Sequence, residues 1–185
     1  MKKNCLIILL SCLSCSGQKT NESVNFVPDV FISNISVLDT TNVTTILGED
    51  VMLNLEGTII KKASFSNIMQ NETLEVIFQP GSYLNEFSKF IVFKSKNDVS
   101  KPQIDIQNFV TESGIELGID KKTLISLKGK PTSITQFISS EIYEYVIDNY
   151  DSSCFLEKYK MSIYRAKYFF ENSKLVRFEF GFDYP

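Results

Sequence analysis

The stretch Leu175-Val176-Arg177-Phe178-Glu179-Phe180-Gly181-Phe182, near the C-terminus, alternates apolar and polar residues. Its even-numbered positions carry four large apolar side chains, and Arg177 and Glu179 lie between them. Successive side chains of a strand point to opposite faces of the sheet. The pattern therefore predicts a strand with one face on a core and the other largely in water.

Other stretches of the chain show the same extended pattern. The polar turn Glu171-Asn172-Ser173-Lys174 joins this strand to a predicted strand over 161–170, so the two form a hairpin. Runs of β-branched and aromatic residues predict strands over 52–60, 74–78, 87–94 and 142–147, and an extended segment over 104–109.

Two helices are predicted, one in each half of the chain. The second begins at the N-cap Asp120 and ends at Gly129, and apolar residues recur between them at helical spacing. The first runs from Asp39 to Gly48 and aligns with it without a gap. The sequence thus predicts an α+β fold of two tandem units, over 26–103 and 104–185. Each unit would place a short helix on one face of an antiparallel sheet.

The second helix carries a recognisable motif. The stretch from Gly114 to Leu124, followed by Lys128-Gly129-Lys130-Pro131, resembles the helix signature of the beta-lactamase-inhibitor-like and BamE (SmpA/OmlA) lipoproteins. These small modules of the cell envelope place a helical segment before an antiparallel sheet, and the inhibitor is a tandem of two units. The resemblance extends over about residues 104–185, whereas in the first half Asp50 replaces the expected proline.

The resemblance implies structural roles for five residues: Gly118 in a tight turn, Asp120 as the helix cap, Leu124 packed on the sheet, and Gly129 with Pro131 ending the helix. It implies an envelope location and binding to other proteins. It supplies no catalytic residue, and a fold by itself does not define a function.

The N-terminus has the layout of a secretory signal. Two lysines precede an apolar run from Cys5 to Leu13, which is too short to span a bilayer. The small residues around Cys15 resemble a lipobox, with Cys12 as the alternative site. We therefore expect a signal peptide over 1–14 and a lipidated polar tether over 15–25. The chain would be anchored to the outer membrane, on its periplasmic or its surface side.

The composition excludes several classes of chemistry. The chain contains no histidine, and Cys154 is the only cysteine after Cys15. Catalysis by Ser-His or Cys-His pairs, imidazole metal sites and thiolate clusters are therefore ruled out. The net charge of −3 gives no electrostatic footprint for nucleic acid. No cofactor and no metal is predicted.

Tyrosines crowd the second half. Tyr143 and Tyr145 share one strand face, as do Tyr164 and Tyr168 if their strand has no bulge. Because tyrosine offers a large rigid area with a polar tip, these four residues are a candidate partner-binding surface. The alternative is that their rings cover the edge of the core.

These observations predict a protein that is not an enzyme. We expect an exported lipoprotein that binds an envelope protein, as an assembly accessory or an inhibitor. One alternative is a hydrolytic enzyme acting on an envelope glycan or peptide with carboxylates such as Glu141 and Glu144. Another is a structural envelope protein with no specific partner.

Overall fold

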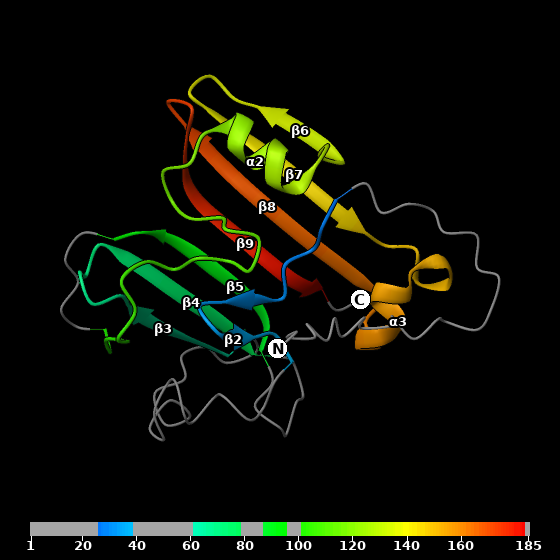
Figure 1. Cartoon of the computed structure of the whole chain (residues 1–185), viewed down its shortest axis with the longest axis horizontal. Helices are drawn as coiled ribbons and strands as arrows, with labels where there is room; N and C mark the ends of the chain where they lie inside the picture. Colours follow the sequence, from blue (N-terminus) through cyan, green and yellow to red (C-terminus); the bar gives the residue numbers. More distant parts are fainter. Residues whose placement is uncertain (1–25, 39–60, 79–86, 96–100, 184–185) are drawn as a thin grey trace, which may run out of the picture.

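The computed structural model describes residues 26–38, 61–78, 87–95 and 101–183 (Figure 1). The strands are β1 (Phe31–Ile32), β2 (Ile35–Ser36), β3 (Lys62–Ser66), β4 (Glu72–Phe78), β5 (Phe87–Lys94), β6 (Ser133–Gln136), β7 (Ser140–Ile147), β8 (Ile163–Glu171) and β9 (Lys174–Asp183). The helices are α2 (Lys121–Lys128), the 3-10 turn η2 (Tyr150–Ser152) and α3 (Cys154–Tyr159).

Seven of these strands form one antiparallel sheet in the order β3-β4-β5-β9-β8-β7-β6. The strands β3 to β5 form one meander and β6 to β9 form another, and the last strand of each pairs with the other (Figure 1). At this junction Phe90 lies opposite Phe180, with ring centroids 5.6 Å apart in an edge-to-face contact. The two halves of the chain therefore share a single sheet.

The prediction of a tandem α+β fold is wrong. Of the described residues, 49% lie in strands and 14% in helices. The pairing of β5 with β9 joins both halves into one sheet, so they are not two separate helix-and-sheet units. The predicted helix from Asp39 to Gly48 and the predicted strand over 52–60 lie outside the described residues.

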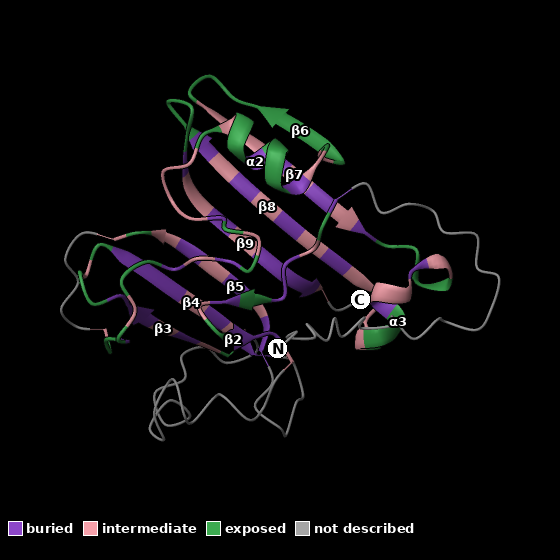
Figure 2. Ribbon diagram, in the orientation of Figure 1, coloured by how far each residue is buried: buried purple, intermediate pink, exposed green. Residues whose placement is uncertain are grey.

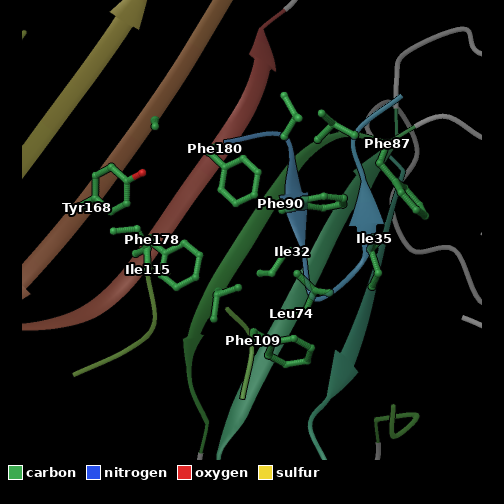
Figure 3. Close-up of a cluster of buried hydrophobic side chains, with 14 of the residues drawn as sticks. Ile32, Ile35, Leu74, Phe87, Phe90, Phe109, Ile115, Tyr168, Phe178 and Phe180 are labelled. Carbon is green, nitrogen blue, oxygen red and sulfur yellow. The ribbon is translucent and has the colours of Figure 1, made fainter. Parts of the chain in front are cut away.

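The core lies on one face of the sheet, which we call the covered face. Buried and half-buried residues alternate along β7, β8 and β9, as the banding in Figure 2 shows. The helices α2 and α3 and the hairpin β1–β2 pack against this face (Figure 1). From the hairpin, Ile32 and Ile35 are fully buried and face Leu74 and Phe90 of the sheet (Figure 3).

The helix α2 forms where the motif places it. The Asp120 carboxylate accepts a hydrogen bond from the backbone N–H of Thr123 at 2.8 Å and caps the helix. Leu124 is fully buried, and Gly129 ends the helix with φ +84°. Pro131 follows two residues later, in agreement with the helix stop.

The extended segment predicted over 104–109 forms no strand. It lies beside β3 instead, where the backbone N–H of Ile104 donates to the carbonyl of Ser66.

Candidate functional site: the open face of the sheet

The four tyrosines predicted to form a partner-binding surface lie on the covered face. Tyr143 is 7% exposed, and Tyr145, Tyr164 and Tyr168 are completely buried. The Tyr145 hydroxyl donates to the carbonyl of Gly129 at 3.0 Å. Their burial contradicts the prediction, because these rings belong to the core and are not accessible to a partner.

The opposite set of alternate residues forms the other side of the sheet, which we call the open face. Its central members are half-buried and come from β5, β7, β8 and β9: Lys89, Ile91, Phe93, Glu144, Arg165, Lys167, Phe169, Arg177, Glu179 and Asp183. Charged residues make up seven of these ten positions. The sequence signal for this face is the alternation of Arg177 and Glu179 with phenylalanines along β9.

A ladder of ion pairs runs across the open face. The Asp183 carboxylate accepts from Lys89 Nζ at 2.5 Å and from Arg165 Nε at 2.8 Å. The Arg165 Nη1 group reaches the Glu144 carboxylate at 2.5 Å. The Ser133 hydroxyl donates to Glu144 at 3.1 Å. The ladder thus connects β5, β9, β8 and β7 with charges of alternating sign, and the Ser133 hydroxyl links it to β6.

Gly181 lies at the centre of this ladder. It pairs with Lys89 on one side and with Arg165 on the other, so it separates the two cations. Its φ is +146°, and a Cβ at this position would collide with the backbone of Ser88 and Lys89. Both cations reach Asp183, two residues further along β9.

The ladder changes the pKa values of its members. Burial raises the pKa of Asp183, but hydrogen bonds from Lys89 and Arg165 outweigh it and hold the pKa below the ordinary value of 3.8. The pKa of Glu144 is lowered in the same way, since hydrogen bonds from Arg165 and Ser133 outweigh its desolvation. Both carboxylates are therefore charged at neutral pH. Glu144 forms an ion pair with Arg165, and Glu141 forms one with Lys121.

Aromatic residues flank the ladder. The Arg177 guanidinium lies 5.0 Å from the centroid of the Phe169 ring, a cation–π contact, and its Nη2 donates to Glu179 at 2.7 Å. Phe93 lies opposite Arg177 on the neighbouring strand. The open face therefore combines paired charges with half-exposed apolar side chains.

A second polar cluster is buried on the covered face of the sheet. Lys128 Nζ contacts the carboxylate of Asp29 and donates to the Ser113 hydroxyl at 3.1 Å and to the Val27 carbonyl at 2.7 Å. Ser113 in turn donates to Asp29 Oδ1 at 2.6 Å. The Tyr164 hydroxyl donates to the Asp29 carbonyl at 2.8 Å. Nothing local in the sequence marks this cluster, because its members are far apart along the chain.

The buried cluster fastens parts of the fold together. Burial lowers the pKa of Lys128, although Asp29 opposes the shift. The side chains of Lys128 and Asp29 are 1% and 0% exposed. A substrate in the solvent therefore cannot reach the contact between Lys128 and Ser113 through either of these side chains. The cluster connects the N-terminal arm, residues 26–38, with α2 and β8.

The described residues contain no group of three or more His, Cys, Asp or Glu placed to hold a metal ion. None of the helices in the described part is long and apolar enough to cross a membrane. The predicted lipidation site Cys15 and its alternative Cys12 lie outside the described residues, as do the signal peptide and the tether.

No family model, curated protein or solved structure matches this chain. The resemblance of the α2 motif to the beta-lactamase-inhibitor-like and BamE lipoproteins therefore stays a prediction.

Proposed function

We propose that this chain is an exported lipoprotein, anchored through Cys15, whose folded part binds another protein through the open face of the sheet. The N-terminal layout supports the first part, since a short apolar run after two lysines leads to a cysteine among small residues. The ion-pair ladder supports the second part and is the observation that carries the proposal.

The alternation of charge along the ladder favours a protein partner. The sign changes at each step from Lys89 through Asp183 and Arg165 to Glu144. A nucleic acid or an anionic lipid surface presents one sign of charge, and it would meet repulsion at every second step. A protein surface carries both signs and can match the sequence of charges.

The neighbouring side chains also suit a protein interface. Arginine and aromatic residues are enriched in such interfaces, and Arg177 lies against Phe169 on this face. Phe93 and Ile91 supply apolar area beside it. The function expected is therefore recognition without chemistry, as an accessory to an assembly or as an inhibitor.

Site-specific photo-cross-linking in the native host tests this proposal. A photo-reactive amino acid at Lys167, on the open face, should form a defined adduct with one protein. The same amino acid at the exposed Lys122, on α2 at the opposite side of the sheet, should not. The substitution Arg177→Glu should reduce the adduct at position 167 severalfold, whereas Lys122→Glu should leave it unchanged. Equal adducts at both positions, or none at Lys167, would contradict the proposed surface.

A further inference from the structure

The two edges of the sheet are treated differently by the fold. At the β3 edge, Ser66 donates its backbone N–H to Pro102 at 2.9 Å, and Ile104 donates to the Ser66 carbonyl at 2.9 Å. That edge also begins with Lys61 and Lys62. Lysines and a covering loop are two common ways in which proteins protect a sheet edge from further pairing.

At the opposite edge, formed by β6, the described residues provide neither protection. All four residues of β6 are exposed, and the stretch Ser133-Ile134-Thr135-Gln136-Phe137-Ile138 contains no charge, proline or glycine. Within the described ranges, β6 pairs only with β7. Ile134, Phe137 and Ile138 are 47%, 58% and 108% exposed. Exposed apolar residues on an unprotected edge mark a site for strand pairing.

The pairing with β7 determines which backbone groups of β6 are available. Phe137 donates to the Ser140 carbonyl at 2.8 Å and closes the hairpin. Hydrogen-bonded and non-hydrogen-bonded pairs alternate along an antiparallel ladder. Counting from this closure, Thr135 directs its N–H and carbonyl towards β7. Ile134 and Gln136 direct theirs outwards, towards an added strand.

We propose that β6 pairs antiparallel with β6 of a second copy of this chain, about a two-fold axis at Thr135. This register places Ile134 opposite Gln136 of the second copy, so the outward groups of both residues form hydrogen bonds. Thr135 lies opposite Thr135 of the second copy, a favourable cross-strand pair. Phe137 lies opposite Ser133 of the second copy, and a large side chain therefore meets a small one.

The lack of charge in β6 allows a second copy to approach at this edge. With a net charge of −3, two copies repel each other in general. The β6 stretch, from Ser133 to Ile138, carries no charge, so self-pairing places no like charges opposite each other there. A two-fold axis also makes the contact self-complementary and closed, and it leaves no further free edge at this side of the sheet.

Cysteine cross-linking in the full chain tests this register. In the proposed dimer the two Thr135 residues form a non-hydrogen-bonded pair, with Cα atoms about 4.5 Å apart, which lies within the range of a disulfide. The two Ser133 residues would lie roughly 13 Å apart, four residues out of register. Thr135→Cys should therefore give a disulfide-linked dimer on mild oxidation, and Ser133→Cys should not.

The native cysteines are common to both variants, so they contribute equally to the background. Dimer formation that is equal for Thr135→Cys and Ser133→Cys would overturn the register, and absence of any dimer would overturn the proposal. A cross-link from Thr135→Cys to a different protein only would show that another occupant uses this edge, which also overturns it.

A second variant separates pairing from folding. Gln136→Pro removes an outward N–H while leaving the hydrogen bonds of Thr135 to β7 in place, as proline is tolerated on edge strands in this orientation. The dissociation constant of the dimer, measured by sedimentation, should rise by at least about tenfold because two hydrogen bonds are lost per dimer. An unchanged dissociation constant, with the near-UV circular dichroism of the tyrosines intact, would contradict the proposed pairing.

Discussion

Asp29 and Lys128 form an ion pair whose side chains are 0% and 1% exposed. Asp29 lies in the N-terminal arm and Lys128 is the last residue of α2, so the pair holds the arm against the helix. Charges removed from water in this way are tolerated only when they are paired and hydrogen-bonded. Ser113 and the Val27 carbonyl provide these hydrogen bonds.

Removal of one member of this pair should strongly destabilise the fold. In Lys128→Met, the carboxylate of Asp29 stays buried without its cation. Breaking a buried pair typically costs about 3–5 kcal/mol of unfolding free energy. We expect a loss of this size in urea denaturation followed by circular dichroism.

The double variant is the control for this prediction. Replacing both charges, in Asp29→Leu with Lys128→Met, removes the unpaired charge and should recover most of the loss. Recovery would be incomplete, because Ser113 loses its acceptor. A double variant as unstable as the sum of the two single variants would show that the charges are not coupled.

Gly181 should be intolerant of any side chain. Its φ of +146° is unfavourable for other residues, and an added Cβ would meet the backbone of Ser88 and Lys89. Gly181→Ala should therefore lower the unfolding free energy by about 3 kcal/mol or more. Gly114→Ala is the matched control, since its φ is +83° but nothing lies within 4 Å of its Cβ. It should cost only about 1–2 kcal/mol.

The strands β4, β5, β7, β8 and β9 could be predicted because their signal is local, whereas β3, at Lys62–Ser66, was missed. The ranges predicted for β5, β8 and β9 differ from the structure by two residues at most. The strand β6 was not predicted, since its four residues are all exposed and Ile134 is its only apolar residue, so it has no burial pattern. The pairing of β5 with β9 joins distant parts of the chain, and no local pattern encodes it. The tandem prediction was wrong for this reason.

The covered face of β7 could not be identified from alternation alone. Its two faces carry Tyr143 and Tyr145 on one side and Ile142 and Val146 on the other, and both sets contain large apolar groups. Which set is buried depends on where α2 and the N-terminal arm pack. The location of the tyrosines and the cluster around Lys128 both depend on these long-range contacts, which the sequence does not display.

Cys15 should be the lipidated residue. We expect the chain to label with a fatty-acid analogue in its host and to fractionate with membranes. Cys15→Ala should abolish labelling and release the chain, whereas Cys12→Ala should do neither. If Cys12→Ala alone abolishes labelling, the lipidation site lies three residues earlier.

The open-face ladder should make stability depend on pH through Asp183. Its pKa in the folded state is below the ordinary value of 3.8, so ionised Asp183 stabilises the fold above that pH. This contribution is lost as the pH falls through the lowered pKa. We expect Asp183→Asn to be less stable than the native chain by about 1 kcal/mol near neutral pH, between values for exposed and buried pairs. The difference should shrink steadily below pH 3.8.

Glu72 and Glu112, whose pKa values are raised by burial, are present in both chains, so their contributions to the pH dependence cancel in the comparison. Urea denaturation of both chains across the acidic range gives this difference directly, and one that stays constant through the acidic range would show that Asp183 is not coupled to Lys89 and Arg165.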